Sequence, residues 1–128
     1  MLKFKKVSLV FLIAGYAVAG LNHYRNPQSY IKIIPHYIPY PVIINILAGS
    51  FEVLFAVMLI FNKTRALAAW GIILMLTAFL PVHIQMVADA PLILGGSIKI
   101  SPFIAWIRLL LQPVLILWVW WHTKTDNV

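Results

Sequence analysis

Four uninterrupted apolar runs dominate the sequence, at about residues 7–21, 42–61, 66–82 and 103–121. As α-helices, runs of 15 to 20 residues cover roughly 22–30 Å, close to the ~30 Å hydrocarbon core of a bilayer. Polar and apolar residues do not alternate along the runs, as they would in the strands of a membrane barrel. The sequence therefore predicts an all-α integral membrane four-helix bundle, with residues 1–128 forming a single domain.

The composition excludes the other large classes of protein. Hydrophobic residues make up 62% of the chain and charged residues 10%, whereas a soluble domain is about half apolar and a quarter charged. The chain has no cysteine, which excludes a disulfide scaffold, a thiol relay, an iron–sulfur cluster and a cysteine nucleophile. The net charge of +7 comes from bases that flank the apolar runs, so it does not predict nucleic-acid binding.

The positions of the basic residues predict the orientation of the helices. The connection at residues 62–65 is short, whereas the other two are about twenty residues long and lie on the opposite side. With the N-terminus inside, six bases lie on the inner side and three on the outer side, which favours N-in, C-in. The inner bases are Lys3, Lys5, Lys6, Lys63, Arg65 and Lys124, and the outer ones are Arg25, Lys32 and Lys99. Alternatively, the first run is a cleavable signal peptide, which would leave three spans.

Small and polar residues mark particular faces of the expected helices. Gly15 and Ala19, four residues apart, predict a face where another helix approaches closely. The second run carries a narrow stripe of small and polar residues, namely Asn45, Ala48, Gly49, Glu52 and Ala56. The fourth run places Ala105, Arg108 and Gln112 on one face, and we expect Pro113 to kink it. We expect Trp118, Trp120 and Trp121 to form an aromatic belt at the inner interface.

The two long connections are unusual for loops. Residues 23–41 hold four prolines and four tyrosines, which argue against a long regular helix and suit a membrane interface. The same segment carries isoleucines that would otherwise be exposed, so we expect it to pack over the end of the bundle. In the second connection, residues 92–100 could form a small hairpin around Gly95 and Gly96.

The buried polar residues are the first candidates for a site. Glu52 lies near the middle of its run, and Arg108 and Gln112 lie in the outer half to middle of theirs. Charges at this depth usually pair within the bundle or mark a pathway, so we expect Glu52 and Arg108 to meet, with Asn45 and Gln112 completing the network. The network could be a structural ion pair that fixes helix register, or a site for a ligand, a quinone or a proton.

Histidines on the outer side form a second group of candidates, comprising His23, His36 and His83 with Asp89 nearby. Three imidazoles and a carboxylate could bind zinc or titrate between pH 5 and 8. Their spacings match no metal motif, and interfacial histidines usually form local hydrogen bonds, so no metal site is predicted. The sequence contains no phosphate loop, no GxSxG motif and no plausible triad, and it identifies no catalytic residue.

Several segments resemble the DoxX family of small membrane proteins. They are residues 20–30 (GLNHYRNPQSY), residues 34–39 (IPHYIP), the spacing Asn45-x3-Gly49-x2-Glu52, residues 64–69 (TRALAA) and the spacing Arg108-x3-Gln112. The resemblance implies a four-helix membrane bundle in the bacterial inner membrane, distantly similar to quinone-reducing thiol oxidoreductases. Redox members of that family use cysteines, which this chain lacks, so the resemblance implies no thiol mechanism of its own.

Two functions follow from this resemblance. The first is an accessory or quinone-proximal subunit of a membrane redox system, with Asn45, Glu52, Arg108 and Gln112 as its buried polar site. The alternative is a non-catalytic assembly factor or chaperone whose polar stripe and outer loops bind client transmembrane helices. In either case the expected partners are the lipid bilayer and a second membrane protein or another copy of the chain. A quinone is the one cofactor that these residues suggest.

Overall fold

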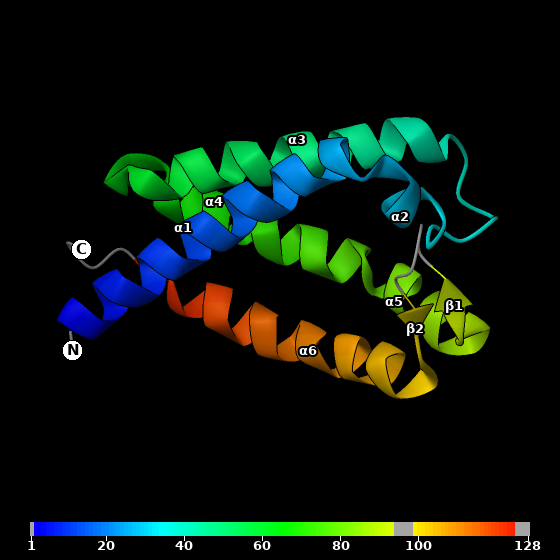
Figure 1. Cartoon of the computed structure of the whole chain (residues 1–128). Helices are drawn as coiled ribbons and strands as arrows, with labels where there is room; N and C mark the ends of the chain where they lie inside the picture. The colour runs from blue at the N-terminus through cyan, green and yellow to red at the C-terminus, as the bar shows by residue number, and fades with distance from the viewer. Residues whose placement is uncertain (1, 94–98, 125–128) are drawn as a thin grey trace.

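The computed structural model describes residues 2–93 and 99–124 (Figure 1). Four of its helical segments are long and apolar enough to cross a membrane. They are Lys3–Arg25, Pro41–Ile60, Asn62–Asp89 and Pro102–Trp121. The expectation of four apolar helices is confirmed, and the chain has the make-up of a multi-pass membrane protein.

Four of the helices begin at or next to a proline. In chain order the elements are α1 (Leu2–Arg25), α2 (Pro27–Ile31), α3 (Pro41–Ile60), α4 (Asn62–Ala78), α5 (Leu80–Asp89), β1 (Leu92–Ile93), β2 (Lys99–Ile100) and α6 (Pro102–Trp121). Proline occupies the first or second position of α2, α3, α5 and α6. At these positions a backbone N–H would have no hydrogen-bond partner within the helix, so proline, which lacks it, is tolerated. At α6, the side chain of Ser101 also accepts a hydrogen bond from the backbone N–H of Ile104.

Two of the helices extend further than the apolar runs predicted. α1 continues to Arg25, so His23 lies on a helix and not in a connection. The third segment does not end at residue 82, because α4 stops at Ala78 and α5 starts at Leu80 after a break at Phe79. Pro81 therefore stands in the first turn of a new helix, which carries the chain on to Asp89.

A single residue, Phe61, separates α3 from α4, so residues 62–65 form the first turn of α4 and not a loop. The guanidinium of Arg65 donates to the carbonyl oxygens of Leu59 (2.8 Å) and Ile60 (3.1 Å) and to Oδ1 of Asn62 (2.7 Å). The last carbonyls of a helix have no partner within the helix, and this buried side chain supplies one. Arg65 thus joins the end of α3 to the start of α4.

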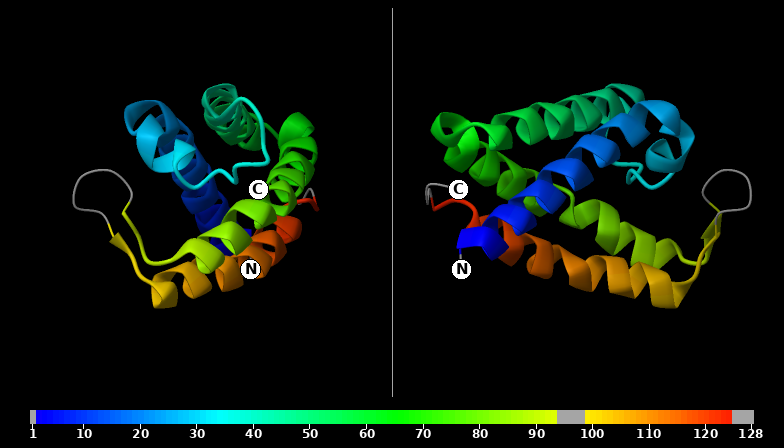
Figure 2. Two further views of the ribbon diagram at one scale, coloured as in Figure 1. Left: turned by 90° about the vertical axis from the view of Figure 1, so that its right-hand side faces the viewer. Right: turned by 60° about the vertical axis from the view of Figure 1, so that its left-hand side comes forward.

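The helices form an open arrangement in which neighbours pack in the order α1, α3, α4, α6, with α5 also against α6. α1 and α6 approach each other where both termini lie and separate towards the opposite end (Figures 1 and 2). At the termini, Nε1 of Trp118 donates to Oγ of Ser8 at 2.7 Å. The main core lies at the same end, and its fully buried members include Leu12, Leu59, Ile72 and Val119.

Two glycines set the closest approach between helices. A Cβ on Gly20 of α1 would lie 2.7 Å from the carbonyl oxygen of Gly49 in α3, and a Cβ on Gly49 would lie 2.6 Å from Cβ of His23. A Cβ on Gly15 would meet nothing within 4 Å. The prediction that Gly15 and Ala19 form the helix-packing face was therefore wrong, since the glycine of α1 that contacts α3 closely is Gly20.

The end of the molecule away from the termini is covered by the connections, as expected. Ile33 is buried in a second apolar cluster with Met86, Ile100 and Ala105. The predicted hairpin is present as an antiparallel pair of short strands, in which Leu92 pairs with Ile100 and Ile93 with Lys99. The glycines around which it was predicted to turn lie outside the described residues.

Candidate functional site

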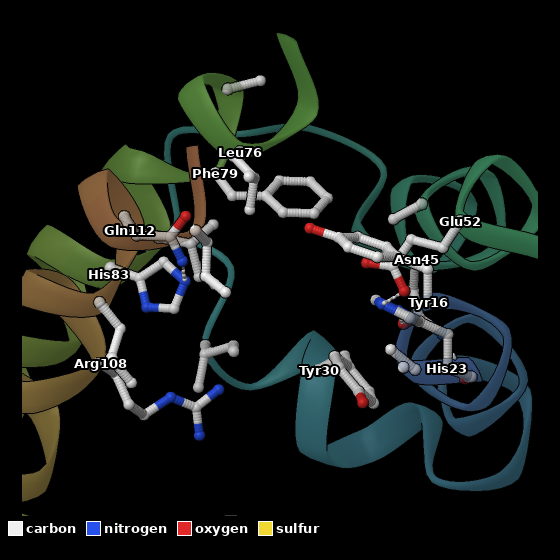
Figure 3. Close-up of a pocket in the computed structure, with 18 of the residues that line it drawn as sticks. Tyr16, His23, Tyr30, Asn45, Glu52, Leu76, Phe79, His83, Arg108 and Gln112 are labelled. Carbon is white, nitrogen blue, oxygen red and sulfur yellow. Dashed lines mark hydrogen bonds and ion pairs between the residues drawn. The ribbon is translucent and has the colours of Figure 1, made fainter. Parts of the chain in front are cut away.

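A cavity of about 640 Å³ lies between the helices and is lined by residues from all four long segments. Figure 3 shows that its polar side chains lie on two sides, facing each other across the space. One side, the His23 wall, belongs to α1 and α3 and carries His23, Asn45 and Glu52. The other, the Arg108 wall, belongs to α5 and α6 and carries His83, Arg108 and Gln112. Ile33, Ile34 and Ile38 of the proline-rich connection line the cavity as well.

The hydrogen bonds of the His23 wall fix where its protons lie. Nδ2 of Asn45 donates to the backbone carbonyl of His23 at 3.0 Å, which sets the orientation of the Asn45 amide, because a carbonyl can only accept. Oδ1 of Asn45 therefore accepts from Nδ1–H of His23 at 2.8 Å. The other ring nitrogen, Nε2, lies 3.5 Å from Oε2 of Glu52. The two atoms form an ion pair when the imidazole is protonated, although Oε2 of Glu52 accepts no hydrogen bond.

The ring of Tyr30 completes the His23 wall. Tyr30, in α2, stacks on the imidazole of His23 with the ring centroids 3.8 Å apart. Its hydroxyl accepts a hydrogen bond from Nδ2 of Asn22 at 2.6 Å. The short helix α2 therefore holds an aromatic ring against the histidine and restricts its rotation.

On the Arg108 wall, Nε2 of Gln112 lies 2.7 Å from Nε2 of His83. An amide nitrogen only donates, so His83 accepts at Nε2 and carries its proton on Nδ1. Nδ1 of His83 and Oε1 of Gln112 are both buried and have no hydrogen-bond partner among the described residues. Nothing in the described part of the chain accepts a side-chain hydrogen bond from Arg108, which is half-buried and lines the cavity.

The expected pair of Glu52 with Arg108 is not formed. Glu52 has His23 as its ion-pair partner, and Arg108 lies on the opposite side of the cavity (Figure 3). The reason is the order of the helices, because α3 packs against α1 and α4, whereas α6 packs against α4 and α5. The four residues of the predicted polar network do line one cavity, but they are divided between its two walls.

The four outer-face candidates separate into two groups. His23 and His83 extend into the cavity and join the predicted polar network. His36 and Asp89 are exposed and lie outside it, and Asp89 accepts a hydrogen bond from Nε2 of Gln85 at 3.0 Å. Within the described residues, no three histidines, aspartates or glutamates come together in a group that could hold a metal ion.

Five aromatic residues of the cavity were not predicted as site residues, namely Phe11, Tyr16, Tyr30, Phe79 and Trp118. Tyr16 precedes His23 by two helical turns and so shares its face, a signal that becomes readable once α1 is known to reach residue 25. Tyr30 was assigned to the membrane interface with the other tyrosines. Trp118 was expected in an interfacial belt but is half-buried and bonded to Ser8.

Comparison with known proteins identifies one family. A family model described as "Domain of unknown function (DUF8561)" matches residues 12–123. No curated protein and no solved structure was found to match. The match contradicts the resemblance to the DoxX family.

Proposed function

The chain belongs to the DUF8561 family, and we propose that it binds a lipophilic quinone in the cavity between its helices, as an accessory subunit of a membrane redox system. One observation carries the proposal. Polar atoms without a hydrogen-bond partner among the described residues are buried on both walls of this mostly apolar cavity. They are Nδ1 of His83, Oε1 of Gln112 and Oε2 of Glu52, and the last of these also forms the 3.5 Å ion pair with His23.

Unpaired polar atoms of this kind are costly. A buried donor or acceptor without a partner costs about 1–3 kcal/mol, and more if the group is charged. Glu52 is 7% exposed and Gln112 is 5% exposed, so the surrounding side chains shield both from solvent. A ligand that donates and accepts hydrogen bonds between the two walls would recover this free energy on binding.

A quinone fits the polarity of the two walls. Its carbonyl oxygens accept hydrogen bonds, and the Arg108 wall offers the guanidinium of Arg108 and the Nδ1–H of His83 as donors. In the reduced form, the two hydroxyl groups donate, and Glu52 and Gln112 each offer an acceptor oxygen. The volume of about 640 Å³ lies within the usual 300–1,000 Å³ of small-molecule sites.

The redox role requires a partner. Reduction of a quinone to a quinol consumes two electrons and two protons, and a membrane electron-transfer protein is the class of partner that would supply the electrons. In its protonated form, His23 beside Glu52 at the edge of the cavity would supply one of the two protons to a quinone oxygen, and the second would come from solvent. Within this proposal the protein lies in the bacterial inner membrane with both termini in the cytoplasm.

The test is a binding measurement that uses Trp118 of the cavity wall as the reporter. Trp70, Trp106, Trp120 and Trp121 are replaced by phenylalanine, and the protein is placed in lipid nanodiscs. We expect a decyl-substituted benzoquinone to quench the remaining fluorescence in a saturable way. Arg108→Leu should weaken this binding, whereas Arg25→Leu, at an exposed position of α1 outside the cavity, should not.

Absence of saturable quenching in a protein that keeps its helical circular dichroism would contradict the proposal. An assembly factor would behave differently in the same preparation. It would bind no quinone, and it would co-purify with a transmembrane segment of its client whether or not Arg108 is replaced.

A further inference from the structure

The polarity of the cavity changes along its length. On α1, the lining residues run from Phe11 and Leu12 through Tyr16 to His23, so the wall becomes polar towards α2. On α6, which runs in the opposite direction, the lining changes from Trp118 and Leu115 to Gln112 and Arg108 towards the same end. The cavity therefore has a polar end beneath α2 and an apolar end near the termini.

The apolar part of the cavity is open at one side. Four of the lining residues are exposed at the surface of the molecule, namely Phe11, Gly15, Ala78 and Leu111. Three of these four lie on α1 and α6, the two helices that meet at the termini and then separate (Figures 1 and 2). The opening therefore lies between α1 and α6, and Phe11 is 66% exposed at its rim.

Gly15 and Leu111 lie at similar levels on the two sides of this opening. Ser8 and Trp118 are hydrogen-bonded, Gly15 lies seven residues beyond Ser8, and Leu111 lies seven residues before Trp118. Seven residues correspond to about 10 Å along a helix axis, so both positions lie well inside the candidate membrane spans. At this depth the opening faces lipid chains, since both helices are long and apolar enough to cross the bilayer.

From these observations we infer that the cavity takes a ligand with one polar ring and a long apolar chain, and that the chain leaves between α1 and α6, past Gly15 and Leu111, into the bilayer. The ring lies at the polar end, between the two walls. The occupant of the opening is the chain of the ligand itself, because the opening is continuous with the ring site and has apolar residues at its rim. This inference rests on the proposed function and adds the orientation of the ligand and the need for a chain.

Gly15 provides a clean test, because a Cβ at this position meets no atom within 4 Å. Gly15→Phe should therefore fold normally while placing a ring in the opening. Ala14→Phe is the matched control, since Ala14 is the exposed neighbour on α1 and does not line the cavity. Ala78→Phe tests the other exposed lining residue, which lies at the end of α4. Leu111→Trp blocks the same opening from α6 if Gly15→Phe fails to fold.

Two probes are compared by Trp118 fluorescence, a benzoquinone with a decyl chain and the same ring without a chain. Gly15→Phe should weaken binding of the decyl compound by about tenfold or more, the scale of a steric overpacking cost. It should leave binding of the chainless ring unchanged, and the control Ala14→Phe should bind both probes as the parent does.

Other outcomes overturn the inference. If Gly15→Phe leaves the decyl compound bound as before, or if Ala78→Phe blocks it, the chain takes another route. If Gly15→Phe weakens both probes equally, the substitution acts on the ring site and not on a chain exit. If the parent protein binds neither probe, the proposed function fails together with this inference. If the parent binds both probes equally well, the chain adds nothing to binding, which would sink the inference and leave the proposed function standing.

Discussion

Nε2 of His23 lies 3.5 Å from Oε2 of Glu52, so the acid buried in α3 has its charge partner at the end of α1. Both residues are buried. Nδ1 of His23 is hydrogen-bonded to Oδ1 of Asn45, which lies seven residues before Glu52 on the same helix. The three side chains therefore tie the last turns of α1 to the first half of α3. At the same time they form one wall of the cavity, so we expect both stability and the proposed ligand binding to depend on them.

We predict that His23 and Glu52 are energetically coupled. Glu52→Gln alone or His23→Gln alone should lower the free energy of unfolding by about 3–5 kcal/mol, because either change leaves a buried charge or polar group without its partner. The double variant should lose clearly less than the sum of the two. Unfolding in mixed micelles measures all four proteins. Strictly additive losses would mean that the 3.5 Å contact contributes no stability.

A parallel cycle with Glu52→Gln and Arg108→Gln serves as the control. The two residues lie on opposite walls, so their effects on stability should be nearly additive (Figure 3). A coupling as large as that between His23 and Glu52 would restore the pairing predicted from the sequence. In the quinone titration, by contrast, both single variants should weaken binding.

The second prediction concerns the contact between α1 and α3. Gly20→Ala and Gly49→Ala should each lower the free energy of unfolding by about 1–3 kcal/mol, because the added methyl would stand under 3 Å from backbone atoms of the other helix. Gly15→Ala is the matched control on the same helix and should be neutral or stabilising by up to about 1 kcal/mol. Equal losses at Gly15 and Gly20 would show that helix flexibility, and not close packing, decides the effect.

The sequence patterns were sufficient to locate the four helices along the chain. They did not predict where each helix ends or which helices pack against each other. Apolar runs identify the four spans, since a chain this apolar has few other ways to satisfy its backbone in a membrane. The first and third runs end too early, at residues 21 and 82, because nearby polar residues and prolines are read as helix ends. Here Arg25 still belongs to α1, and Pro81 begins a new helix in line with the old one.

The candidate site was predicted as a set of residues but not as an arrangement. Asn45, Glu52, Arg108 and Gln112 do line one cavity, since polar groups in a membrane protein turn away from lipid. Depth along each helix cannot tell which helices are adjacent, so Glu52 was paired with Arg108 and His23 was left out. The spacing of small residues has the same limitation, because Gly15 faces open space while Gly20 faces a helix.

The third prediction is that Arg65 holds the junction of α3 and α4 together. Arg65→Lys should destabilise the protein by about 1–3 kcal/mol, because one ammonium cannot reach the two carbonyls and the amide oxygen that the guanidinium binds. Lys63→Gln, at an exposed position in the same turn, should change stability by less than about 0.5 kcal/mol. Thermal unfolding in one detergent compares the two, and equal effects would refute the role of Arg65.

The fourth prediction is the orientation of the chain. Six basic residues flank the ends of the helices on the side of the termini, against three on the side of the long connections. A reporter fused after Lys124 should therefore show a cytoplasmic location, and one inserted at Ser29 should show the opposite. The decisive contrary result is a periplasmic signal from the fusion at Lys124.

The last prediction is a pH dependence of stability that originates at His122, just beyond α6. Nε1 of Trp118 donates to Oγ of Ser8 at 2.7 Å, and Oγ of Ser8 lies 3.1 Å from Nε2 of His122. When the hydroxyl of Ser8 donates its proton to this contact, Nε2 of His122 accepts the hydrogen bond. Nε2 then carries no proton, and the imidazole is neutral. Burial, and to a smaller extent the neighbouring positive charges of Lys5 and Arg65, together lower the pKa of His122 to about 4.

In the unfolded chain, His122 returns to an ordinary pKa of 6.5. Above that pH neither state binds the proton, so stability does not depend on His122. Between pH 6.5 and about 4, the unfolded chain binds a proton that the folded protein does not. The free energy of unfolding should therefore fall as the pH is lowered, by up to about 1.4 kcal/mol per pH unit, and level off below the folded pKa.

His122→Gln removes this proton while leaving the other histidines in place, so the difference between the two unfolding curves from pH 4 to pH 8 isolates the contribution of His122. Parallel curves over that range would mean that His122 is protonated equally in both states, and that the hydrogen bonds from Trp118 through Ser8 do not keep it neutral.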